Sequence, residues 1–152
     1  MNQPTITIRE YQHTDQPAVL TLLRLNTPDF FSPEEESDLI YYLENEIEYY
    51  FVIETDGQIC GCGGFNFSGN HAVGKISWDI IHPDFQGKSL GKTLLKYRIE
   101  RLKEFAEVET IIVRTSQLVY KFYEKVGFQL VETVKDYWAK GFDLYKMEYR
   151  GT

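Results

Sequence analysis

The 152-residue chain contains only two cysteines, Cys60 and Cys62, and only three histidines. Cysteines two positions apart on a strand share a face but suit a disulfide bond poorly, and no further ligand cluster accompanies them as in a zinc site. We therefore expect no metal and a reducing, cytoplasmic environment. The N-terminus lacks a basic segment followed by an apolar one, and no apolar run reaches the length of a membrane span, so we expect no membrane partner.

Lysine and arginine are also absent from residues 25–74, which carry ten acidic side chains. The charges before this segment cancel, and the residues after it carry fourteen basic and eleven acidic side chains, so the formal net charge is −7. An acidic chain with a pI near 5.0 is not typical of a nucleic-acid-binding protein, and we expect no nucleic-acid partner. The uneven distribution would instead let one part of the molecule attract a cation and another hold an anion.

Hydrophobic residues make up 43% of the chain, which fits one folded domain spanning residues 1–152. The spacing of apolar residues predicts elements in the order βααβββαβαββ, a mixed α/β or α+β domain with a central sheet. The predicted strands cover residues 5–11, 50–54, 59–67, 73–82, 110–114, 128–134 and 142–149. The predicted helices follow caps at Thr14 or Asp15 and at Ser32, and then cover residues 87–105 and 117–126.

The segment Gln86–Lys92, with the sequence QGKSLGK, lies between a predicted strand and a predicted helix. Unpaired amides at a helix N-terminus, together with the helix dipole, can hold phosphate oxygens. Two glycines would allow close approach of the backbone and two lysines add positive charge: Gly87, Gly91, Lys88 and Lys92. An ordinary strand-to-helix turn with a solvated basic face explains the same residues equally well. A P-loop is excluded because His82 stands where its first glycine is required.

A second cluster, Phe122–Phe128, indicates the end of a helix with Gly127 as its cap. Within it, Tyr123 fits either a half-buried aromatic residue or a phenol placed to donate a proton to a leaving group.

Together, the segments His82–Lys92 and Phe122–Phe128 resemble the GNAT superfamily of acetyl-CoA-dependent N-acyltransferases. The first is similar to that family's [QR]-x-x-G-x-[GA] loop, and the second to its helix before the sixth strand. The order of elements agrees over nearly the whole chain. The resemblance implies the GNAT fold, a mixed and mostly antiparallel central sheet flanked by helices, with acetyl-CoA as co-substrate and no metal.

The resemblance also implies roles for individual residues. Backbone amides of Gln86–Lys92 would hold the pyrophosphate of coenzyme A, the end of the strand at Asp79–Ile81 would pair with the pantetheine arm, and Tyr123 would protonate the departing thiolate. The implied cofactor-binding residues are Ile80, Ile81, Gln86, Gly87, Lys88, Ser89, Leu90, Gly91, Lys92 and Ser116. Two of them depart from the family pattern, which prefers glycine at Ser89 and often has asparagine at Ser116.

In this chemistry a neutral amine attacks the thioester directly in a ternary complex, so a base or a water leading to one is needed. Alternation along the strand places Lys75, Ser77, Asp79 and Ile81 on one face, where Asp79 is the only carboxylate and the candidate base. A strand-end residue that bonds backbone or a lysine is the alternative for Asp79. The acidic residues 34–36 are expected mainly to favour the first turn of their helix.

In the family, the segment between the first two helices often borders the acceptor site. Phe30, Phe31 and Tyr41 are therefore candidates for substrate binding, with core packing as the alternative. Tyr137 and Trp138 could form the opposite wall or a homodimer contact. We expect an N-acetyltransferase acting on a small cationic amine. A peptide, protein N-terminal or lysine acetyltransferase and a non-catalytic coenzyme A-binding module are the alternatives.

Overall fold

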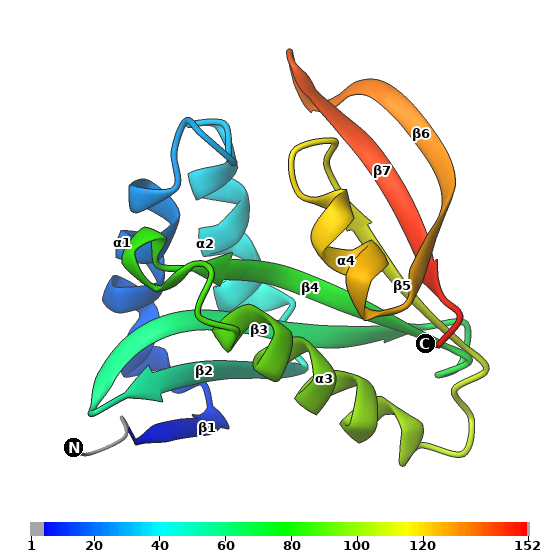
Figure 1. The fold of residues 1–152 in the computed structure, drawn as a ribbon, viewed down its shortest axis with the longest axis horizontal. Helices are drawn as coiled ribbons and strands as arrows, with labels where there is room; N and C mark the ends of the chain where they lie inside the picture. The colour runs from blue at the N-terminus through cyan, green and yellow to red at the C-terminus, as the bar shows by residue number, and fades with distance from the viewer. Residues whose placement is uncertain (1–4, 152) are drawn as a thin grey trace.

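The computed structural model describes residues 5–151, whose strands form one seven-stranded sheet in the order β1-β2-β3-β4-β5-β7-β6 (Figure 1). The strands are β1 (Ile6–Glu10), β2 (Tyr49–Thr55), β3 (Gln58–Ser68), β4 (Val73–Ile81), β5 (Thr110–Thr115), β6 (Phe128–Ala139) and β7 (Phe142–Tyr149). The helices are α1 (Gln16–Leu25), α2 (Glu35–Asn45), α3 (Leu90–Lys103) and α4 (Tyr120–Val126), with short 3-10 helices at His13–Asp15 and Pro83–Phe85. All neighbouring strands are antiparallel except β4 and β5. The predicted order and the α+β class are confirmed.

Three predicted boundaries differ from the structure by three residues or more. The helix predicted from residue 87 begins at Leu90, because Ser89 has a left-handed φ of 65° that the helix cannot include. The helix predicted from residue 117 begins at Tyr120, after a turn in which the carbonyl of Ser116 accepts from Val119 and Tyr120. Strand β6 continues to Ala139, because the hairpin with β7 runs on past an irregular register.

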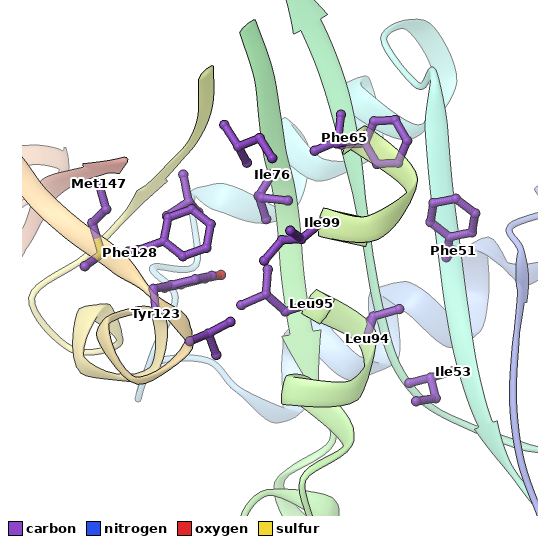
Figure 2. Packing of buried hydrophobic residues seen from close by; sticks show 14 of the residues in the cluster. Phe51, Ile53, Phe65, Ile76, Leu94, Leu95, Ile99, Tyr123, Phe128 and Met147 are labelled. Atoms are coloured by element: carbon purple, nitrogen blue, oxygen red, sulfur yellow. The ribbon is translucent and has the colours of Figure 1, made fainter. Parts of the chain in front are cut away.

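The sheet has a hydrophobic layer on each face. Alternation along β2 places Phe51 and Ile53 in the layer under α3, and Tyr50 and Val52 in the layer under α1 and α2. Figure 1 shows α3 on one face of the sheet and the α1–α2 pair on the other. In Figure 2 the ring of Tyr123 lies among the side chains of the first layer, between α3 and the β6–β7 region.

Strands β4 and β5 stay together only at their beginnings. Val73–Ile76 pair with Thr110–Val113, and β4 then continues to Ile81 without β5 beside it (Figure 1). A parallel sheet that opens in this way leaves backbone N–H and C=O groups of β4 free for another partner. The opening therefore creates a place where an extended molecule can lie against β4.

A register shift opposite Gly63 interrupts the alternation of β4, and Trp78 there has a φ of 47°. The extra residue reverses the faces on either side of it. Ser77 bonds Asn66 next to Tyr42 of α2, whereas Asp79 contacts Arg98 of α3 on the opposite face. The prediction that Ser77 and Asp79 share a face is therefore wrong, because it assumed a regular strand.

Candidate active site

A cavity of about 1090 Å³ lies where β4 and β5 diverge. Its walls include Ser77–Ile81 of β4, residues 113–116 at the end of β5, and the α4 residues around Tyr123. The loop before α3 forms another part of the wall. Further wall residues come from the segment between α1 and α2, from α2 and the residues after it, from β3, and from Trp138 and Phe142 of the β6–β7 hairpin. This volume is large enough for a ligand of cofactor size.

The segment Gln86–Lys92, called here the anion loop, contributes five of its seven residues to the cavity: Gln86, Gly87, Ser89, Gly91 and Lys92. Because α3 begins at Leu90, the first amides of the helix lack intrahelical acceptors. A β-carbon on Gly91 would come within 3.3 Å of Phe122 and 3.4 Å of Ile81, so a glycine allows the helix start to pack closely. The side chains of Lys88 and Leu90 lie elsewhere, over the ring of Phe85 and in the core respectively.

Side-chain amides hold the anion loop in place. Nε2 of Gln86 donates to Oδ1 of Asn26 over 3.0 Å and to the carbonyl of Ile81 over 3.2 Å. Nδ2 of Asn26 donates to the same carbonyl and to that of Leu22 in α1. The loop, α1 and the end of β4 are thus tied together, and the Ile81 carbonyl is already occupied.

Besides Ile81, two predicted cofactor residues lie outside the anion loop, and both are buried. Ile80 packs in the hydrophobic layer under α1 and α2, and it also borders the cavity. Ser116 is buried at the cavity wall, and its hydroxyl oxygen accepts from the amide of Leu118.

The two predicted catalytic residues are in direct contact. The hydroxyl of Tyr123 donates to Oδ2 of Asp79 over 2.5 Å. Oδ1 of Asp79 forms an ion pair with Arg98, whose side chain is completely buried. Burial, together with the neighbouring Asp79 carboxylate, raises the pKa of Tyr123 well above its ordinary value of 10.0. Tyr123 therefore keeps its proton at neutral pH, and both oxygens of Asp79 are engaged.

Another part of the cavity, called here the acceptor region, combines aromatic and acidic side chains. It consists of Phe31, Glu35, Tyr42, Glu46, Glu48 and Trp78. The rings of Phe31 and Trp78 are stacked with centroids 6.3 Å apart, and Tyr42 lies beside Trp78. Lys75 also borders the cavity.

Glu35 is the buried carboxylate of this region. Its Oε2 accepts from the amide of Ser32 over 2.8 Å. The N-cap of α2 is Glu34 and not Ser32 as predicted, because the helix begins only at Glu35. Burial is the main cause that raises the pKa of Glu35 above its ordinary value of 4.5, with smaller contributions from the charges of Asp38 and Glu34. A buried carboxylate that borders a cavity is a candidate proton acceptor or cation ligand.

The predicted substrate residues divide between two places. Phe30 and Phe31 border the cavity. Tyr41 is 59% exposed and lies instead beside a smaller hollow of about 290 Å³, together with Trp78 and Trp138. Within residues 5–151 no group of three or more His, Cys, Asp or Glu side chains could hold a metal ion. No helix in that range has the length and apolar character needed to cross a membrane.

Sequence reasoning missed several residues of the site, among them Arg98, Trp78 and Glu35. Arg98 could have been found, because it lies four residues after Leu94 and four before Leu102 on the inward stripe of a helix. Trp78 enters the site through the bulge opposite Gly63; the glycines of residues 59–67 indicate bulging in β3, but nothing in the sequence of β4 points to Trp78. Glu35 was grouped with its exposed neighbours, and only the fold distinguishes it.

Comparison with known proteins places these features in context. Residues 19–128 match the family described as "Acetyltransferase (GNAT) family". An amino-acid acetyltransferase of Pasteurella multocida (strain Pm70) is 32% identical over 131 residues, which cover 83% of this chain and 28% of that relative. The chain thus spans little more than a quarter of the length of this curated relative.

Solved structures show the same fold. The ribosomal-protein-S18-alanine N-acetyltransferase from Escherichia coli superimposes with a TM-score of 0.79 at 19% identity, covering 95% of this chain and 93% of that one. An aminoglycoside 6'-N-acetyltransferase complexed with coenzyme A gives a TM-score of 0.74 at 14% identity, covering 93% and 95%. The names of these relatives thus refer to different acetyl acceptors.

Proposed function

The chain belongs to the GNAT family of acetyltransferases, and we propose that it transfers an acetyl group from acetyl-CoA to the primary amine of a small cationic molecule. The observation that carries this proposal is the cavity between β4 and β5, which joins the anion loop, Tyr123 and the acceptor region in one space. Holding thioester and amine together in a ternary complex would make positioning the main source of rate acceleration.

Acetyl-CoA fits the cavity by its shape and charge. The pantetheine arm would lie along the edge of β4 that β5 does not cover, at Asp79–Ile81, and the pyrophosphate of the cofactor would bind the amides of the anion loop. Lys92, Lys121 and Lys125 border the cavity and supply positive charge for phosphate groups. Ser89, through its backbone amide, and Ser116 are proposed as further cofactor contacts.

Tyr123 is proposed as the acid that protonates the coenzyme A thiolate. Its raised pKa keeps the proton in place until the C–S bond breaks, and its hydroxyl must then turn from Asp79 to the sulfur. Asp79 as the base remains an untested prediction. Its two engaged oxygens favour a role in holding Tyr123 instead.

Glu35 is the better candidate to accept a proton from the substrate ammonium group. It borders the cavity, it has a raised pKa, and the structure shows no cation paired with it among the described residues. A base is most effective when its pKa lies near the operating pH, and burial moves Glu35 in that direction.

The acceptor region favours a cationic amine over an amino acid. An amino-acid acceptor would bring its own carboxylate toward Glu35, Glu46 and Glu48, and like charges repel in a partly desolvated site. The stacked rings of Phe31 and Trp78 can in contrast attract a cation through their faces. The activity of the Pasteurella relative therefore need not extend to the acceptor of this chain.

A thiol-release assay with acetyl-CoA tests this function. The acceptor panel should contain monoamines, diamines, glutamate and a peptide with a free N-terminus, all at equal concentration. We expect the highest kcat/KM with amines that carry a second positive charge. Preference for glutamate would reject the cationic acceptor, and preference for the peptide would favour protein acetylation. Binding of coenzyme A without thiol release from acetyl-CoA in the presence of any acceptor would favour a binding module.

A further inference from the structure

Arg98 is a completely buried cation on the inward face of α3. The other inward residues of this helix are apolar: Leu90, Leu94, Leu95, Ile99 and Leu102. Burying a guanidinium group is costly unless its donors and its charge are satisfied. Each of its three nitrogens has a partner: Nε donates to the carbonyl of Leu94 over 3.2 Å, Nη1 donates to that of Gly64 over 3.0 Å, and Nη2 pairs with Asp79.

The backbone makes room for this ion pair at two separate places. A β-carbon on Gly63 would lie 2.5 Å from Oδ1 of Asp79 and 2.7 Å from Nη1 of Arg98, so only a glycine leaves the space free. The bulge at Trp78 turns Asp79 toward α3 instead of toward α2. A side chain at Gly63 would force the ion pair to shift, and a β4 without the bulge would direct Asp79 to the other face.

The carboxylate of Asp79 connects Arg98 to the active site. Arg98 binds Oδ1 and the Tyr123 hydroxyl binds Oδ2, so the two residues contact opposite oxygens of one planar group. A guanidinium group fixed by two carbonyls holds the orientation of that plane. The position of the Tyr123 oxygen therefore depends on Arg98, which does not border the cavity itself.

We propose that Arg98 is a positioning residue for acetyl transfer, which acts through Asp79 to hold the Tyr123 oxygen at the cavity wall and to balance the charge formed when its hydroxyl gives up its proton. The proposal rests on the proposed function. The amine nitrogen forms the C–N bond and releases one proton to a base, while the C–S bond breaks and the sulfur receives the proton of Tyr123. The phenolate then recovers a proton from solvent. Between these events Asp79 and the phenolate are two adjacent anions, and Arg98 is the cation that faces them.

Kinetics of a double-mutant cycle test this role. Arg98→Lys keeps the charge but cannot reach Gly64, Leu94 and Asp79 together, so kcat should fall between about tenfold and 100-fold while the KM for acetyl-CoA changes by less than about twofold. In a Tyr123→Phe background the same substitution should lower kcat no further. Arg101→Lys on the same helix is the matched control, because Arg101 lies over the rings of Tyr49 and Phe51 and should leave kcat unchanged.

Gly63→Ala provides a second route, because it displaces the ion pair without altering any of its members. It keeps the test available if Arg98 variants fail to fold, which circular dichroism would reveal. The expected result is the same fall in kcat and the same loss of that effect in the Tyr123→Phe background. An equal fall in kcat in the wild-type and Tyr123→Phe backgrounds, or no fall in the wild-type background, would overturn the positioning role.

A measurement without substrate separates this proposal from the proposed function. A phenol proton held by a carboxylate at 2.5 Å should give a downfield, slowly exchanging proton resonance in NMR. It should be present in the wild type and in Arg101→Lys, absent in Tyr123→Phe, and shifted or lost in Arg98→Lys and Gly63→Ala. An unchanged resonance in both of the last variants would reject Arg98 as the orienting group. Absence of acetyl transfer with an intact, Arg98-dependent resonance would instead reject the proposed function.

Discussion

The hydroxyl of Tyr123 and Oδ2 of Asp79 are joined by a hydrogen bond of 2.5 Å, although 44 positions separate the two residues in the sequence. The contact crosses the opening between β4 and β5, because Asp79 belongs to β4 and Tyr123 to the helix that follows β5. It brings a protonated phenol to the wall of the cavity and fixes it there. Although the two residues are in contact, a substitution of Tyr123 should mainly affect acetyl transfer, whereas a substitution of Asp79 should mainly affect the stability of the fold.

Tyr123→Phe should lower kcat by roughly 100-fold, the lower range for loss of a positioned acid. The KM for acetyl-CoA should change little, because the ring and its packing between Phe122 and Phe128 are retained. Steady-state kinetics with saturating acceptor would measure both. Tyr120→Phe is the control, since Tyr120 lies on the same helix but packs against Tyr145. An unchanged kcat in Tyr123→Phe would exclude the acid role.

Asp79→Ala should lower the free energy of unfolding by about 3–5 kcal/mol, because it leaves the buried charge of Arg98 without its partner. Urea titration followed by circular dichroism would measure the change. Glu36→Ala removes a partner of Arg24 from an exposed ion pair and should have a much smaller effect. Equal losses from the two substitutions would show that Arg98 does not depend on Asp79.

The order of elements could be predicted because apolar spacing and the glycine after α4 are local signals. What could not be predicted depends on pairing between distant strands. The bulge at Trp78 arises where two residues of β4 oppose Gly63 of β3. The glycines of residues 59–67 indicate bulging in that strand, but nothing in the sequence of β4 shows which of its residues is displaced. The face of Asp79 was consequently misassigned, although its place beside the cavity was expected.

The candidate site was predicted unevenly for a similar reason. Gly87, Gly91 and Tyr123 belong to contiguous motifs, so their roles could be hypothesised from the sequence. Glu35 and Arg98 differ from their charged neighbours only in burial, which depends on the packing of α2 and α3 against the sheet. A charged residue on the apolar stripe of a helix was the one available signal, and it points to Arg98.

Ser89→Gly should raise the free energy of unfolding by about 1 kcal/mol, because a β-carbon is unfavourable at its left-handed φ of 65°. The same change removes a side chain beside the amides of the anion loop, so the Kd for acetyl-CoA should fall. Thermal unfolding and isothermal titration calorimetry would measure the two effects. Weaker binding by the glycine variant would show that the Ser89 hydroxyl itself contributes to holding the cofactor.

Glu35 should favour activity at the expense of stability. Its pKa is raised in the folded chain, so folding disfavours its ionised form. Above the ordinary pKa of 4.5 the unfolded chain carries the charge at no penalty, and Glu35 therefore lowers the free energy of unfolding as the pH rises through and above this value. Below it, Glu35 is protonated in both states and the penalty disappears.

Glu35→Gln should consequently raise the free energy of unfolding at pH 7 and have little effect near pH 4, as urea titrations at the two pH values would measure. The glutamine can still accept from the Ser32 amide, so this hydrogen bond is retained. At the same time kcat/KM for a cationic amine should fall by about tenfold or more, because the acceptor region loses a proton acceptor and a charge. Glu36→Gln is the adjacent control: Arg24 lowers the pKa of Glu36, so this change should reduce stability at pH 7 and leave catalysis intact. If Glu35→Gln lost stability as Glu36→Gln does, burial of the Glu35 charge would not be destabilising. If Glu35→Gln left kcat/KM unchanged, Glu35 would not belong to the acceptor site.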